Sequence, residues 1–289
     1  MINQKHDVAA PSKRVHKVFK SKSQPRKRIL ESLIDRVNNR IVAFVTRRKF
    51  LHEIGRELFS NPEKDALEHC YDGETSELNR IKHDLIKSLE NQDKIYLSKC
   101  PYCLMREPET WDHYLPKSKF PEFSVYSPNL IWVCNKCNQK KSDGLVENVK
   151  EVIHTYFDKL PEDCRLVCRI NIDEDHIPNA DFYINNYDSS DCAELLERHF
   201  LAFELRDLYI KESGSYISSI IKEFSLRYPG GISALQLEDE LMAKYQSIPA
   251  SWGKNHWQAA VLKGLNECEG LADLINSTAS EQLRGWIRN

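Results

Sequence analysis

The sequence predicts an α+β fold in which a small ββα unit, with an antiparallel strand extension, lies between two helical regions. Apolar residues recur at the spacing of amphipathic helices over residues 26–93 and again over 189–289. Between them, two pairs of cysteines frame two short apolar runs and a lysine-rich segment. Apolar and polar residues then alternate strictly over 164–173, as expected for a strand. This expected strand extends the central domain, which we place at 94–188.

The N-terminal end of the chain is strongly basic. Residues 1–50 hold 14 Lys and Arg against 3 Asp and Glu, whereas the remainder holds 27 against 40. Residues 1–25 carry few large apolar side chains, so we expect a basic flexible arm there. Such an arm suggests contact with a polyanion or an acidic partner, and a solvated tail would have the same composition.

The region 26–93 is expected to form two or three helices. An apolar stripe begins just after Pro25, and a second helix start is indicated at Asn61-Pro62, where proline suits the first helical position. A further stripe of helical period runs from Leu78 to Leu89.

Two C-x-x-C pairs, Cys100-Pro-Tyr-Cys103 and Cys134-Asn-Lys-Cys137, predict a structural zinc site. Each pair presents two thiolates on one tight turn, and both pairs fall within 38 residues. A zinc ion with four thiolate ligands has no open position for water or substrate, so it would stabilise the fold without catalysing a reaction. Nine cysteines, an odd number, fit a reducing cytoplasm better than a disulfide framework.

The zinc frame is expected to enclose a ββα unit. Residues 109–114 and 130–133 have strand character, and 135–141 is read as a short helix. On neighbouring strand positions, Asp112 and His113 would point to opposite faces and could therefore serve different roles.

Within this frame the chain resembles the HNH (ββα-metal) endonucleases, in the zinc-knuckle subtype of phage endonuclease VII. The resemblance covers about residues 98–145, under a fifth of the chain. Asparagine stands at the third signature position, where other members have histidine. The residues that carry this resemblance are Asp112-His113, Asn129, Asn138 directly after the last cysteine, and Lys141.

The resemblance implies a role for each of these residues. His113 would be the general base that deprotonates the attacking water, since imidazole is largely neutral at neutral pH. Asp112 and Asn138 would hold one divalent cation, Mg²⁺ or Mn²⁺, through hard oxygen ligands. Asn129 would orient His113, and Lys141 would reach a substrate phosphate.

Four further lysines, Lys117, Lys119, Lys136 and Lys140, are candidates for contacts to a nucleic-acid backbone, and DNA is expected ahead of RNA. Taken singly, every one of these side chains has an ordinary structural explanation as a turn, cap or surface residue. Only their joint order inside the zinc frame favours catalysis.

Segments at 112–117, 120–123 and 153–157 are similar to HNH proteins of Septu and retron antiphage systems. That resemblance implies an effector controlled by a co-encoded ATPase. The chain has no P-loop motif, so a nucleotide-driven step would belong to the partner. A cytoplasmic location is expected, because no apolar run of about 18 residues or secretory signal is visible.

Three functions remain open at this stage. The first is a defence nuclease within a complex, and the second is a stand-alone restriction-type HNH endonuclease. The third is a zinc-framed nucleic-acid-binding or scaffold protein whose site is silent. Metal-dependent cleavage that requires His113 would exclude the third, and association with an ATPase would separate the first from the second.

Overall fold

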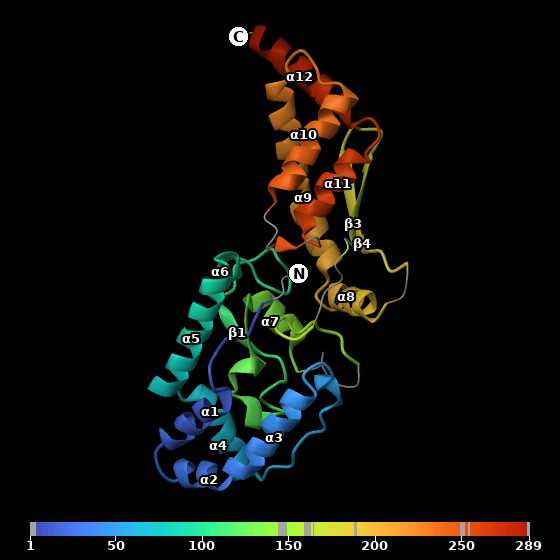
Figure 1. Cartoon of the computed structure of the whole chain (residues 1–289). Helices are drawn as coiled ribbons and strands as arrows, with labels where there is room; N and C mark the ends of the chain where they lie inside the picture. The colour runs from blue at the N-terminus through green and yellow to red at the C-terminus, as the bar shows by residue number, and fades with distance from the viewer. Residues whose placement is uncertain are drawn as a thin grey trace. The chain divides into compact units, whose positions relative to one another are not determined.

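The chain forms two compact units, residues 1–160 and 161–289, each of which is described by itself (Figure 1). A computed structural model describes residues 4–143, 149–158, 163, 165–187, 190–248, 252–253 and 255–287.

The first unit combines helices with one small sheet. Its two strands pair antiparallel, with Thr110 opposite Val133 and Asp112 opposite Ile131. Short 3₁₀ turns, η1 (Leu51–Glu53), η2 (Pro121–Phe123) and η3 (Ser127–Asn129), connect the longer elements. These are α1 (Pro11–Lys20), α2 (Arg26–Ser32), α3 (Ile34–Thr46), α4 (Asn61–Asp72), α5 (Ser76–Gln92), α6 (Ile95–Ser98), β1 (Thr110–His113), β2 (Leu130–Val133) and α7 (Asn135–Lys141).

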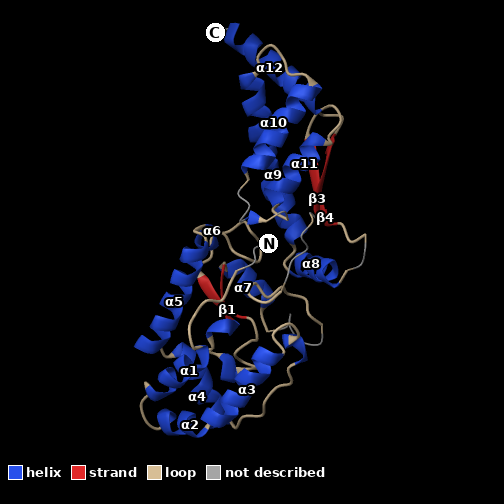
Figure 2. Ribbon diagram, in the orientation of Figure 1, coloured by secondary structure: helices blue, strands red, loops and turns tan. Residues whose placement is uncertain are grey.

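The predicted ββα unit is present, and the α+β fold class is confirmed. Strand β2 and helix α7 have the predicted bounds, while β1 is one residue shorter at each end than the predicted run 109–114. Figure 2 shows the two strands of this sheet among the surrounding helices.

The expectation of a flexible arm over residues 1–25 is wrong. Helix α1 occupies much of that segment, and Val15, Val18 and Phe19 are buried on one of its faces. Ahead of the helix, the Gln4 backbone N–H donates to the Thr155 carbonyl at 3.0 Å. The segment is poor in apolar residues, but the few present have helical spacing and therefore form one packing face.

Local sequence fixes the ends of the helices that lead to the zinc frame. Ser60 and Glu63 form a capping box at the start of α4, and the Thr75 hydroxyl accepts the Leu78 N–H at 3.2 Å at the start of α5. At the other end of α4, the buried Lys22 ammonium donates to the His69 carbonyl at 2.9 Å. A cation at this position interacts favourably with the negative end of the helix dipole.

An aromatic core supports the loop between β1 and β2. The Phe44 ring meets Phe123 and Tyr126 edge-on, with centroids 5.0 and 5.2 Å apart, and Phe157 packs on the same ring. Such contacts contribute about 0.5–1.5 kcal/mol each beyond the buried area. This loop carries the Ser124 carbonyl that bonds His113, so the aromatic core supports the position of the imidazole.

The second unit consists of one hairpin and five helices within its described residues. Strand β3 pairs antiparallel with β4, and Cys168 lies opposite Phe182. Gly264 lies so close to the β3 backbone that an added Cβ would be 2.3 Å from the Cys168 carbonyl oxygen. The elements are β3 (Leu166–Ile172), β4 (Pro178–Ile184), α8 (Asp191–Ala202), α9 (Leu205–Arg227), α10 (Ala234–Ser247), α11 (Trp257–Asn266) and α12 (Leu271–Ile287).

The strand predicted over 164–173 is present as β3, with Leu166, Cys168 and Ile170 buried, although Cys164 lies outside the described residues. The hairpin does not belong to the domain expected over 94–188. It packs against α11 and α9, so it is part of the second unit, which begins at residue 161. Among the described residues, no helix is both long enough and apolar enough to cross a membrane.

Candidate metal centre and active site

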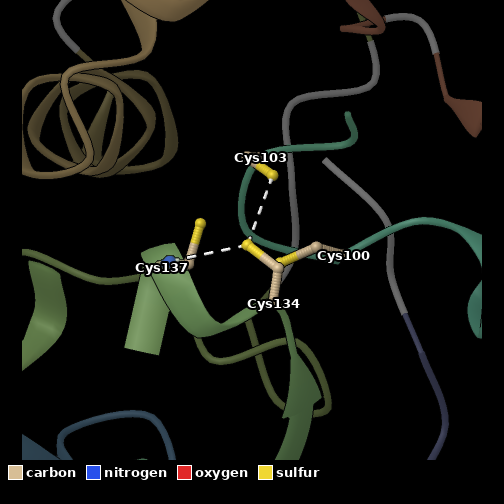
Figure 3. Close-up of side chains that lie close together, drawn as sticks. All are labelled: Cys100, Cys103, Cys134 and Cys137. Atoms are coloured by element: carbon tan, nitrogen blue, oxygen red, sulfur yellow. Dashed lines mark hydrogen bonds between the residues drawn. The ribbon is translucent and has the colours of Figure 1, made fainter. Parts of the chain in front are cut away.

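The four cysteines of the two C-x-x-C pairs converge on one point. Their sulfur atoms all lie within 4.8 Å of one another, and all four residues are buried (Figure 3). The Sγ atoms of Cys103 and Cys134 are 4.0 Å apart, about twice the length of a disulfide bond. Zn–S bonds of about 2.3 Å place tetrahedral ligands about 3.8 Å apart. The cluster therefore fits one zinc ion held by four thiolates.

Each cysteine pair lies on a turn stabilised by its own backbone. The Cys100 N–H donates to the Arg106 carbonyl at 2.7 Å, and Leu104 closes the first turn with a φ of 54°. In the second pair, Cys134 caps helix α7, where its sulfur accepts the Cys137 N–H at 3.5 Å. The positive end of a helix dipole favours a thiolate at this position.

Asp112 is buried and held from both sides of the zinc frame. Its Oδ2 accepts the hydroxyl of Tyr102 at 2.8 Å, and its Oδ1 accepts the ammonium of Lys141 at 2.9 Å. Tyr102 lies inside the first cysteine pair, and Lys141 ends the helix that begins at the second pair. Zinc binding therefore fixes both partners of this carboxylate. Sequence reasoning missed Tyr102, whose only signal was its place within a C-x-x-C turn.

Replacing Tyr102 by Phe removes one of the two partners of Asp112 while the ring that fills the core remains. Hydrogen bonds to a charged group contribute about 1.5–3 kcal/mol, so the free energy of unfolding of the first unit should fall by about that amount. Denaturant titration would measure the change, with zinc content expected to stay constant. Tyr126→Phe is the matched control, because Tyr126 is buried in the same unit without a bond to Asp112. Equal effects in the two variants would contradict the role of Tyr102.

Lys141 does not extend towards a phosphate as the sequence suggested. Its side chain is 1% exposed, and its ammonium also donates to the His113 carbonyl at 2.8 Å. A buried carboxylate needs a counter-charge, and Lys141 supplies it for Asp112. The direct phosphate contact predicted for Lys141 is therefore wrong for this structure.

His113 points away from Asp112, as expected for neighbouring strand positions. Its Nε2 lies 2.8 Å from the Ser124 carbonyl oxygen, which can only accept. Nε2 therefore carries the proton, and Nδ1 keeps its lone pair. Burial lowers the pKa of His113 to about 4, against the opposing effect of the bond to Ser124. The imidazole is thus neutral at neutral pH, with one nitrogen fixed and the other able to accept a proton.

Asn129 is fully buried and ties the end of β1 to the loop that contacts His113. Its Oδ1 accepts the Leu115 N–H at 2.8 Å, and its Nδ2 donates to the Leu115 carbonyl at 3.0 Å. Nδ2 also donates to the Phe123 carbonyl at 3.3 Å. Phe123 directly precedes Ser124, whose carbonyl holds the imidazole. Asn129 therefore connects the end of β1 to the loop whose carbonyl holds the imidazole.

We expect Asn129→Ala to lower the free energy of unfolding of the first unit by about 2–4 kcal/mol. The substitution removes the amide that bonds the buried Leu115 N–H and carbonyl, at a cost of about 1–3 kcal/mol for each unsatisfied group, whereas the Phe123 carbonyl keeps the Tyr126 N–H. Denaturant unfolding would measure this loss. Asn79→Ala on the exposed face of α5 is the control and should change stability by less than about 0.5 kcal/mol. A loss at Asn129 no larger than at Asn79 would contradict the prediction.

Asn138 lies on α7, three residues before Lys141, and is half-buried. Residues at this spacing share a helix face, with Cβ atoms about 5–6 Å apart. Helical spacing therefore places Asn138 on the same face of α7 as Lys141, whose ammonium bonds Asp112. Carboxylate and amide oxygens suit Mg²⁺ or Mn²⁺. A cation there would have to share Asp112 with the Lys141 ammonium.

The predicted backbone-contact lysines differ in their surroundings. Lys136 and Lys140 are exposed on α7. Lys117 pairs with Asp72, and the Lys119 ammonium donates to the Asp143 carbonyl. Lys136 and Lys140 are thus exposed, and Lys117 and Lys119 contact other parts of the unit.

Tyr71 contacts His113 from helix α4, outside the ββα unit. The two rings meet edge-on with centroids 4.4 Å apart. Tyr71 lies about forty residues before His113 in the chain, so no local pattern connected them. Helix α4 therefore belongs to the surroundings of the candidate base.

The two units carry opposite charge. Residues 1–160 hold 29 Lys and Arg against 22 Asp and Glu, and residues 161–289 hold 12 against 21. The unit that contains the zinc frame and His113 is the basic one, which favours contact with a polyanion.

The chain is similar to Protein ea31 of Escherichia phage lambda, with 30% identity over 131 residues. The matched part amounts to 43% of this chain and 44% of the phage protein, so the chain spans less than half of that relative's length. No family model matches the sequence, and no solved structure matches it. The structure itself defines a zinc-binding α+β protein with a four-cysteine site.

Proposed function

We propose that this chain is a metal-dependent HNH endonuclease that hydrolyses phosphodiester bonds, in DNA rather than RNA. The geometry of His113 carries the proposal. Its Nε2 is fixed by the Ser124 carbonyl, and its Nδ1 keeps a lone pair for a proton. On the opposite side of the strand, both cysteine turns hold the carboxylate of Asp112 through Tyr102 and Lys141.

In the proposed reaction, Nδ1 of His113 takes a proton from water as the water oxygen attacks phosphorus, and the P–O bond to the leaving sugar oxygen breaks. The leaving oxygen takes a proton from solvent. The bond to Ser124 keeps the ring in one orientation while this happens. The phosphate charge of bound substrate raises the pKa of a nearby imidazole, which makes it a stronger base. Asp112 and Asn138 would hold Mg²⁺ or Mn²⁺, which supplies charge stabilisation to the transition state.

The zinc ion has a structural task in this proposal. Four thiolates complete its tetrahedral coordination, so it offers no position for water or a phosphate oxygen. Its contribution to catalysis is indirect, through Tyr102 and Lys141.

The resemblance to antiphage HNH proteins extends the proposal to a cytoplasmic defence effector restrained by a co-encoded ATPase. Co-purification of this chain with an ATPase encoded beside it would support that extension. A chain that cuts DNA at full rate alone, and does not bind the ATPase, would favour the restriction-type alternative.

A zinc-framed nucleic-acid-binding protein without catalysis is the second candidate function. Lys141 favours it, since its ammonium lies against the carboxylate that would bind the cation. DNA binding without cleavage under any divalent cation, alone or with the ATPase, would support this alternative.

The substrate is tested by incubating purified, zinc-loaded protein with supercoiled plasmid and, separately, with a tRNA pool. We expect nicked plasmid in Mg²⁺ or Mn²⁺, because one ββα site per chain cuts one strand at a time. Cleavage of tRNA with intact plasmid would overturn the choice of DNA.

A further inference from the structure

Helices α4 and α5 bring a group of side chains to His113 that the ββα unit does not contain. Tyr71 of α4 lies against the imidazole ring. Lys82 of α5 and Lys117, from the segment after β1, both lie over the Tyr71 ring. These three residues are called the Tyr71 cluster.

The Tyr71 cluster holds two positive charges close to the candidate base. The Lys82 ammonium is 4.6 Å from the Tyr71 ring centroid, and the Lys117 ammonium is 5.4 Å from it. The same ring touches His113, so one aromatic side chain connects both cations to the imidazole. Attraction between each ammonium group and the face of the ring favours this placement of the lysines.

The acidic partners of these lysines are exposed. Glu74 lies 3.6 Å from Lys82 with its side chain 69% exposed, and Asp72 pairs with Lys117 with its side chain 54% exposed. Exposed ion pairs stabilise a protein only slightly, so an incoming anion can replace either carboxylate at low cost. The lysine side chains themselves are 21% and 33% exposed, which leaves their ammonium groups accessible to a ligand.

We propose that Tyr71, Lys82 and Lys117 form a phosphate-binding subsite that holds the nucleic-acid backbone beside the phosphodiester facing His113. This inference rests on the proposed nuclease function and adds the N-terminal helices to its substrate-binding surface. Lys82 and Lys117 would contact phosphate oxygens. Tyr71 is a positioning residue that keeps both ammonium groups and the imidazole in place.

Phosphate fits this subsite better than a nucleobase. Lysines act as point charges without the fixed fork that reads base edges, so they bind the backbone irrespective of sequence. The Tyr71 ring is already covered by His113 and the two ammonium groups, so its contacts are made within the protein.

The first test measures binding of a short DNA duplex by fluorescence anisotropy over a range of salt, with zinc-loaded protein and no added Mg²⁺ or Mn²⁺. Each phosphate contact adds about 0.9 to the slope of log K against log salt. We expect the double variant Lys82→Gln, Lys117→Gln to lose about 1–2 from that slope. Lys87→Gln, exposed further along α5, is the control and should keep the wild-type slope. Lys82→Arg with Lys117→Arg should restore it.

The second test separates positioning from folding. Tyr71→Phe keeps the ring that both ammonium groups and the imidazole contact, so it should lose much less activity than Tyr71→Leu, which should raise KM and lower kcat with zinc content unchanged. Equal kinetics in Tyr71→Phe and Tyr71→Leu would overturn the positioning role.

Failure of the subsite and failure of the nuclease proposal give different results. A wild-type salt slope in the double lysine variant, together with normal plasmid cleavage, would overturn the subsite and leave the nuclease intact. A reduced slope in a protein that never cleaves would support the subsite as a phosphate-binding surface and overturn the nuclease.

Discussion

His113→Ala is expected to abolish metal-dependent plasmid cleavage while the protein stays folded. A positioned general base contributes about 10²–10⁴-fold to the rate, and the Ser124 carbonyl fixes Nε2 of His113 while Nδ1 is left to accept a proton. The measurement is the initial rate of nicking of supercoiled DNA at saturating Mn²⁺. We expect the rate of the variant to fall by at least about 10²-fold.

His83→Ala is the matched control for this prediction. His83 lies on α5 with its side chain 73% exposed, so its removal should leave the rate unchanged. Circular dichroism and zinc content should be the same in both variants and wild type. A His113→Ala protein that nicks DNA at nearly the wild-type rate would show that another group removes the proton from water.

Removal of zinc, by a strong chelator or by Cys134→Ser, is expected to unfold much of the first unit. The four buried thiols form no disulfide that could replace the metal. In zinc-finger peptides the apparent free energy of zinc binding is about 10–16 kcal/mol, comparable to the whole stability of a domain. Limited proteolysis should then cut within residues 1–160, while the second unit, which supplies none of the four thiols, resists cleavage.

Cys192→Ser provides the control for the zinc prediction, because Cys192 is exposed and lies outside the cluster. Metal analysis should find one zinc ion per chain in wild type and in Cys192→Ser, and less in Cys134→Ser. A Cys134→Ser protein with wild-type zinc content and proteolytic resistance would contradict the four-thiolate site.

The ββα unit and the zinc site could be predicted because their determinants are local. Each cysteine pair specifies its own turn, and β2 and α7 have the bounds read from the sequence. The opposite directions of Asp112 and His113 follow from strand geometry alone.

The parts that could not be predicted depend on contacts between distant segments. Lys141 is buried because its ammonium pairs with Asp112, which lies 29 residues earlier in the chain. Tyr71 and Ser124 reach His113 only once α4 and the loop after β1 have packed. The order of the N-terminal segment could not be read from its average composition, which is polar, although Val15, Val18 and Phe19 share one helix face.

The most direct test of the nuclease account is a titration of Mn²⁺ against plasmid nicking, with zinc content measured in the same samples. Wild-type protein and Asp112→Asn would be compared. The account predicts no nicking at zero Mn²⁺, full nicking as Mn²⁺ rises with zinc constant at one per chain, and a much higher Mn²⁺ requirement for Asp112→Asn. Nicking that is independent of added Mn²⁺, or identical in the two proteins, would contradict a cation held by Asp112.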